Sequence, residues 1–137
     1  MTNNGRPHRV LIVEDNPTDV VMLKRSLVEH AISHELTVID DGEEAIEYLA
    51  KCNEVTKPDL IIIDLNLPQK DGLDVLRKYR FSPLLVNTKM LVLTSSEAPG
   101  DRNRAELIGV DAYLQKPREM AAYLAIGSTI KELLGKT

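Results

Sequence analysis

The stretch from Pro58 to Pro68, PDLIIIDLNLP, constrains the fold of this chain more than any other segment. Leu60 to Ile63 is an unbroken run of large aliphatic residues, most of them β-branched. Such a run is typical of a strand buried on both faces, as in a parallel sheet covered by helices. Asp64 ends the run at the carboxyl edge, where open α/β sheets bind their ligands. On this segment alone, a functional carboxylate and an ordinary strand end are equally good interpretations.

The rest of the chain repeats this alternation of a short aliphatic strand and an amphipathic helix. We expect strands at 10–13, 36–39, 60–63, 90–93 and 112–114, and helices at about 17–28, 43–51, 73–80, 101–108 and 119–134. Five strands alternating with five helices predict an α/β fold with a parallel sheet, right-handed crossovers and helices on both faces. Residues 1–8 are predicted to be a flexible N-terminal tail, and residues 9–137 a single domain.

Start signals and apolar spacing fix the first and last predicted helices. Asn16 is expected to cap the first helix, with Pro17 in its first turn. The inward stripe of this helix is predicted to be Val20, Leu23, Leu27 and Val28. The inner face of the last helix is predicted to be Met120, Tyr123, Leu124, Gly127, Ile130 and Leu134.

Composition limits the partners of the chain. Its 137 residues carry a net charge of −4 without a basic block, which argues against a broad face that binds nucleic acid. The single cysteine, Cys52, cannot form an internal disulfide, as expected in a reducing cytosol. No apolar run is long enough to span a membrane, and the N-terminus lacks the apolar core of a signal peptide. We therefore expect a soluble cytoplasmic domain that binds neither nucleic acid nor membrane.

Polar side chains follow four of the predicted strands. Glu14 and Asp15 follow the first, Asp64 the third, Thr94 the fourth and Lys116 the fifth. Because the carboxyl ends of parallel strands meet at one edge, these residues should converge. Ordinary strand ends explain this convergence poorly.

Clustered carboxylates predict a divalent cation at this edge. Without a counter-charge, mutual repulsion would raise the pKa of at least one of them. Hard oxygen ligands and near-octahedral geometry favour Mg²⁺. Asp15 and Asp64 are the expected direct ligands, Glu14 would act through water, and the backbone carbonyl of Asn66 is a further expected ligand. Beside the metal, Asp64 could accept a phosphoryl group as an acyl phosphate, with Lys116 and Thr94 binding two of its oxygens.

Four motifs in this order resemble the receiver domain of two-component response regulators. They are VEDN at 13–16, DLNLPQKDG at 64–72, LTSS at 93–96 and LQKP at 114–117. The resemblance covers residues 10–134, and is strongest to the small single-domain regulators paired with bacterial and cyanobacterial phytochrome histidine kinases. It implies a flavodoxin-like, doubly wound sheet with strand order 2-1-3-4-5.

The resemblance also implies a mechanism and partners. Asp64 would take its phosphoryl group from a sensor histidine kinase or a phosphotransfer protein. Thr94 would then move toward the phosphate while Tyr113 turns inward, and the bond between Lys116 and Pro117 would be cis. The fourth helix, fifth strand and fifth helix would form the altered face, available to partners or to a second copy. Such a protein signals by changed contacts, and at most dephosphorylates itself slowly.

Three other functions are alternatives, and each has a feature of the sequence against it. An aspartyl-nucleophile phosphohydrolase of the haloacid dehalogenase type would use a second aspartate as acid and base, but that position holds Asn66, which cannot shuttle protons. A metal-dependent nuclease is disfavoured by the acidic composition. A pseudo-receiver would bind partners without phosphorylation, and the complete set of acids and Lys116 argues against it.

Overall fold

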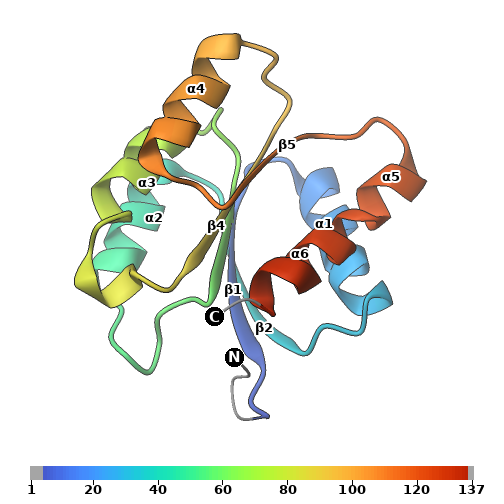
Figure 1. Ribbon diagram of the computed structural model, residues 1–137, viewed down its shortest axis with the longest axis horizontal. Helices are drawn as coiled ribbons and strands as arrows, with labels where there is room; N and C mark the ends of the chain where they lie inside the picture. Colours follow the sequence, from blue (N-terminus) through green and yellow to red (C-terminus); the bar gives the residue numbers. More distant parts are fainter. Residues whose placement is uncertain (1–4, 136–137) are drawn as a thin grey trace.

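The computed structural model describes residues 5–135 and consists of a five-stranded parallel sheet between two layers of helices (Figure 1). The strands are β1 His8–Val13, β2 His34–Ile39, β3 Leu60–Ile63, β4 Lys89–Thr94 and β5 Ala112–Gln115. Their order in the sheet is β2-β1-β3-β4-β5, which confirms the predicted fold. β1 begins at His8, within the segment predicted to be a tail, and residues 1–4 of that segment lie outside the described residues.

Helices cover both faces of the sheet. They are α1 Pro17–Glu29, α2 Gly42–Ala50, α3 Gly72–Tyr79, α4 Pro99–Ile108, α5 Met120–Leu124 and α6 Ile126–Leu134, with a short 3-10 helix η1 at Pro83–Leu85. Figure 1 shows α2, α3 and α4 on one side, and α1, α5 and α6 on the other. No helix within residues 5–135 is long and apolar enough to cross a bilayer.

The strands divide their side chains between two cores. In β3, Leu60 and Ile62 pack with the residues of α1, α5 and α6, whereas Ile61 and Ile63 pack with those of α2, α3 and α4. All four are at most 1% exposed. This alternation explains why the run is apolar at every position, since neither face of β3 meets water.

α1 starts where the sequence predicts. The Asn16 side chain accepts hydrogen bonds from the backbone N–H groups of Thr18 at 2.9 Å and Asp19 at 3.4 Å, as an N-cap does. Val20, Leu23 and Leu27 are buried as predicted, but the prediction for Val28 is wrong, because it is 69% exposed. Each residue turns the helix by about 100°, so the position after Leu27 leaves the stripe.

The prediction of one continuous last helix is also wrong, because α5 and α6 are separated at Ala125. At the break, the Ser26 hydroxyl donates to the carbonyl of Leu124 at 2.6 Å and accepts from the N–H of Gly127 at 2.7 Å. A side chain that enters the backbone ladder in this way interrupts a helix. α1 therefore determines where the C-terminal helix breaks.

Close packing between α1 and α6 requires a glycine at position 127. A Cβ atom there would overlap the imidazole ring of His30.

Before the break, Tyr123 is buried as predicted, but Met120 is 55% exposed and does not belong to the inner face. Met120 occupies the first turn of α5, before the helix reaches the core.

Candidate functional site

The strand register brings the predicted polar residues to one edge of the sheet. Val13 pairs with Ile63, and Ile63 pairs with Val92, so the residues that follow β1, β3 and β4 are neighbours. The N–H of Asp64 donates to the carbonyl of Val13 at 3.0 Å, and that of Lys116 donates to the carbonyl of Thr94 at 2.8 Å. Hydrogen bonds between backbone groups therefore fix the positions of the Cα atoms from which these side chains extend.

Three carboxylates form a compact cluster at this edge. Glu14, Asp15 and Asp64 each offer an oxygen within 4.8 Å of the others. Glu14 is 2% and Asp64 5% exposed, whereas Asp15 faces solvent. The N–H of Asn66 donates to Asp64 Oδ1 at 3.2 Å, which holds the loop after β3 against the cluster.

The cluster fits a divalent cation. Glu14 Oε1 is buried and accepts no hydrogen bond within residues 5–135; Lys116 Nζ lies 2.8 Å from it as an ion pair, without hydrogen-bond geometry. Lys116 Nζ also contacts Asp19 and Asp64, so a single ammonium only partly compensates the charge of these carboxylates, and a divalent cation would compensate the rest. Carboxylate oxygens this close together, one of them exposed to solvent and its waters, match the ligands that Mg²⁺ prefers.

Burial and charge raise the pKa of Glu14 to about 7. Desolvation is the main cause and the Asp64 charge adds to it, while nearby Lys116 acts in the opposite direction. This agrees with the prediction that one carboxyl pKa in the cluster would rise. One ammonium group does not fully offset the concentration of negative charge here.

Lys116 reaches into the cluster from the end of β5. Its Nζ donates to Asp64 Oδ2 at 2.8 Å and to Asp19 Oδ2 at 2.7 Å. Burial disfavours the charged ammonium, but these bonds and the pairing with Glu14 outweigh it and raise the pKa of Lys116. The lysine is therefore a fixed cation at the bottom of the site.

Asp19 is a site residue that the sequence analysis did not identify. It lies in the first turn of α1, and its Oδ1 accepts a hydrogen bond from the Tyr123 hydroxyl at 2.9 Å. Burial and this bond raise the pKa of Tyr123. The sequence did offer one indication of its role. Asp19 lies four residues after Asp15, in the first turn of a helix that starts at the same edge of the sheet.

Thr94 ends β4, and Tyr113 lies on the neighbouring strand β5, packed against the core of α2, α3 and α4. Thr94 is fully buried, and its Oγ1 accepts from the N–H of Ser96 at 3.2 Å. The Tyr113 hydroxyl is buried and finds no hydrogen-bond partner within residues 5–135. The Arg102 guanidinium lies 5.0 Å from the centre of the Tyr113 ring. The structure thus brings Glu14, Asp15, Asp64, Thr94 and Lys116 to one edge, with Tyr113 on the adjacent strand.

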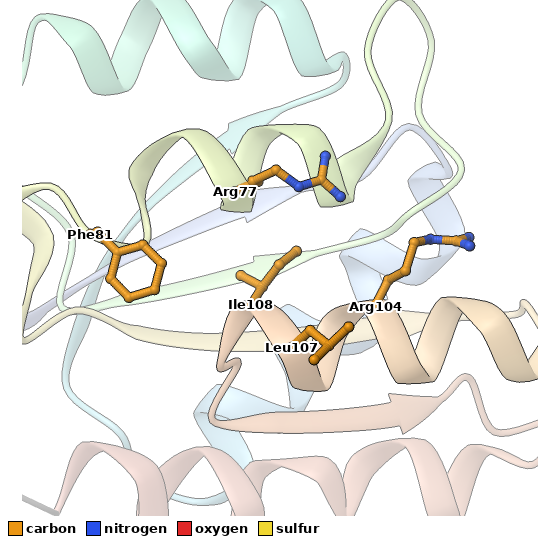
Figure 2. Close-up of a pocket in the computed structure, with 5 residues that line it drawn as sticks. All are labelled: Arg77, Phe81, Arg104, Leu107 and Ile108. Atoms are coloured by element: carbon orange, nitrogen blue, oxygen red, sulfur yellow. The ribbon is translucent and has the colours of Figure 1, made fainter.

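A pocket lies between α3 and α4 (Figure 2), and none of its lining residues belongs to the acidic cluster. It has a volume of about 240 Å³ and is lined by Arg77, Phe81, Arg104, Leu107 and Ile108. Arg77 pairs with Asp74 at 2.6 Å, and Arg104 pairs with Asp101. Because both guanidinium groups are already engaged, the acidic edge is the stronger candidate site.

A model of the response regulator receiver domain family matches residues 10–126. This chain belongs to that family. Receiver domains are the phospho-accepting signalling modules of two-component systems, and Mg²⁺ is the cation they hold at their acidic site. The shared fold and the convergence of acids and lysine agree with this membership.

Phytochrome response regulators are among the most similar proteins. Response regulator Rcp1 of Synechocystis sp. is 35% identical over 124 residues, which span 88% of this chain and 84% of Rcp1. The structure of the phosphorylated cyanobacterial phytochrome response regulator RcpA has a TM-score of 0.84 and 31% identity, and covers 93% of this chain and 94% of RcpA. The Mn²⁺-bound form of Rcp1 has a TM-score of 0.84 and 32% identity, over 96% of this chain and 97% of that one.

A magnesium-bound receiver domain is also similar. The receiver domain of sensor histidine kinase PA1611 from Pseudomonas aeruginosa PAO1, with a magnesium ion in the active-site cleft, has a TM-score of 0.75 and 25% identity. The match covers 95% of this chain and 99% of that domain.

One implication of the resemblance is wrong for this receiver domain. The Lys116–Pro117 bond is trans, since residues 5–135 contain no cis peptide bond. The ammonium nevertheless reaches Asp19 and Asp64 at hydrogen-bond distance.

Proposed function

We propose that Asp64 of this receiver domain accepts a phosphoryl group and that the protein signals by changed protein contacts. The observation that carries the proposal is the contact of 2.8 Å between Lys116 Nζ and Asp64 Oδ2, beside two further acids. A nucleophilic carboxylate, a phosphate-binding cation and a metal-ligand set then share one edge. These are the groups that phosphoryl transfer to a carboxylate requires.

In the proposed reaction, an oxygen of Asp64 forms a bond to phosphorus while the P–N bond of a phosphohistidine breaks. The electron pair of that bond remains on the imidazole nitrogen, which takes up a proton. Lys116 donates to one phosphoryl oxygen and the Thr94 hydroxyl to another. When bound by Asp15, Asp64, Glu14 through water and the Asn66 carbonyl, Mg²⁺ supplies charge neutralisation for the phosphoryl oxygens.

The proposed partners are a sensor histidine kinase, with a phytochrome favoured by the similarity to Rcp1 and RcpA, or a phosphotransfer protein. In this proposal the protein acts in the cytoplasm, where free Cys52 stays reduced. Its output surface is the face of α4, β5 and α5, including exposed Leu107 and Met120. A second copy of the chain is one proposed occupant of this face. Tyr113 on β5 and Thr94 would act as its switch.

Incubation with Mg²⁺ and a small acyl phosphate donor tests the proposal. Intact-mass spectrometry should show the addition of one base-labile phosphoryl group to the wild type and none to Asp64→Asn. Asp74→Asn is a matched control, because Asp74 is an exposed partner of Arg77 on α3. An unmodified wild type, or a modified Asp64→Asn variant, would contradict the proposal, and sustained turnover of phosphomonoesters would favour a phosphohydrolase.

A further inference from the structure

We infer that Asp19 is a positioning residue, which holds the Lys116 ammonium in place while the other partners of the lysine change during phosphoryl transfer. The inference rests on the proposed function of Asp64. It assigns a role to a carboxylate outside the acidic cluster, and it connects the site to α5 through Tyr123.

The three acceptors around Lys116 have different fates. Asp64 becomes an acyl phosphate, so one of its oxygens becomes the bridge to phosphorus and the group is no longer a charged carboxylate. Glu14 belongs to the cluster that fits a cation, and its Oε1 has no hydrogen bond to the lysine. Asp19 is not part of that cluster and holds Lys116 Nζ at 2.7 Å, the shortest of the three contacts. It is therefore the acceptor that remains when the metal and the phosphoryl group arrive.

Asp19 is itself held in position. Its Oδ2 accepts from Lys116 and its Oδ1 from the Tyr123 hydroxyl. Tyr123 is 5% exposed within the core of α1, α5 and α6, and the Asp19 side chain is 14% exposed. Both carboxylate oxygens thus have fixed donors on a buried framework, and the carboxylate cannot turn away from the lysine without losing one of them.

The charge of the Lys116 ammonium also favours Asp19 as the residue that positions it. A lysine has a flexible four-carbon stem, and ordering it costs about 1.5–2 kcal/mol of rotamer entropy. A divalent cation at the cluster would also repel the ammonium. An anion beside Lys116 that does not bind the metal offsets both effects, and Asp19 is the residue in that place.

Two variants of Asp19 separate position from charge. Asp19→Ala removes the acceptor, so the rate constant for phosphorylation by acetyl phosphate at saturating Mg²⁺ should fall roughly tenfold, the equivalent of one charged hydrogen bond. Asp19→Asn keeps an oxygen for Lys116 and an amide for the Tyr123 oxygen but loses the negative charge, so its rate should lie between those of wild type and Asp19→Ala. Glu29→Ala, at the exposed far end of α1, is the control for net charge.

A double-mutant cycle tests whether Asp19 acts through the lysine. In a Lys116→Met background, Asp19→Ala should cause no further loss of rate, because the group that it positions is gone. An Asp19→Ala rate equal to wild type, an Asp19→Asn rate as low as that of Asp19→Ala, or fully additive losses in the cycle would each overturn the inference. If Asp19 had a purely structural role, these substitutions would change the unfolding midpoint, but the loss of rate on Asp19→Ala would not depend on the presence of Lys116.

A crystal structure with Mg²⁺ and beryllofluoride, a stable phosphoryl analogue, provides a readout independent of rate. The distance between Lys116 Nζ and Asp19 Oδ2 should remain within hydrogen-bond range, below about 3.2 Å. Separation beyond about 4 Å would overturn the inference. If the wild type gains neither phosphoryl group nor beryllofluoride, the proposed function fails; if it gains them but Asp19 releases the lysine, only the inference fails.

Discussion

Two tyrosines, which pack against the cores on opposite faces of the sheet, differ in what their hydroxyl groups contact. Tyr123 donates to Asp19 at 2.9 Å and is thereby connected to the lysine. The Tyr113 hydroxyl is buried with no partner among the described residues. A hydroxyl with a charged acceptor stabilises one conformation, whereas a buried hydroxyl without one favours any rearrangement that supplies a partner. We therefore expect the α5 side of the site to be the fixed side and the β5 side to be the one that moves.

Replacing Lys116 should have the largest effect, because it removes the cation that joins the fixed side together. In the presence of a chelator, Lys116→Met leaves Glu14, Asp19 and Asp64 close together without a counter-charge. Loss of one partner of a buried ion pair costs about 3–5 kcal/mol in unfolding free energy. Urea unfolding measures this loss, and added Mg²⁺ should recover part of it.

Lys24→Met is the matched control for that experiment. Lys24 lies on the exposed surface of α1, and a surface substitution of this kind changes stability by less than about 0.5 kcal/mol. Equal losses in the two variants would mean that the three contacts of Lys116 add nothing to stability.

Tyr123→Phe should have an intermediate effect. It leaves the rest of the ring in the core but removes the donor to Asp19 Oδ1, in a site where the Asp19 side chain is 14% exposed. Loss of a hydrogen bond to a charged group should lower the unfolding free energy by about 1.5–3 kcal/mol. The same urea titration measures it, and an unchanged midpoint would show that the bond to Asp19 does not constrain α5.

Tyr113→Phe should have the smallest effect, and of opposite sign. The substitution removes a buried hydroxyl without a partner and keeps the ring beneath Arg102. We expect no loss of stability and a gain of up to about 1 kcal/mol. A loss as large as that of Tyr123→Phe would contradict the contrast between the two sides, because it would show that Tyr113 is also held.

The central part of the site could be predicted from sequence because it depends only on the strands. Once Leu60–Ile63 and its counterparts are placed in a parallel sheet, the residues after them must share an edge. Asp64, Thr94 and Lys116 are attached directly to paired strands, and the register therefore carries them together. No knowledge of helix orientation is required.

Asp19 and Tyr123 could not be predicted in the same way. Their contact depends on how α1 is rotated on the sheet and on where α5 ends. That ending is decided by Ser26, which binds both Leu124 and Gly127. Helical periodicity describes one helix at a time, so it predicted a continuous C-terminal helix and placed Met120 inward. The apolar periodicity of each helix gives no information about which residues of the two helices contact each other.

The glycine at the end of the loop after β3 leaves the Asp64 backbone no room behind it. The N–H of Gly72 donates to the carbonyl of Leu65 at 3.1 Å, and a Cβ on this residue would overlap the carbonyl of Asp64. With backbone packed directly on backbone, the main chain at Asp64 has no space to move toward α3. In the proposed phosphorylated state, the added volume would therefore have to be accommodated on the open side of Asp64.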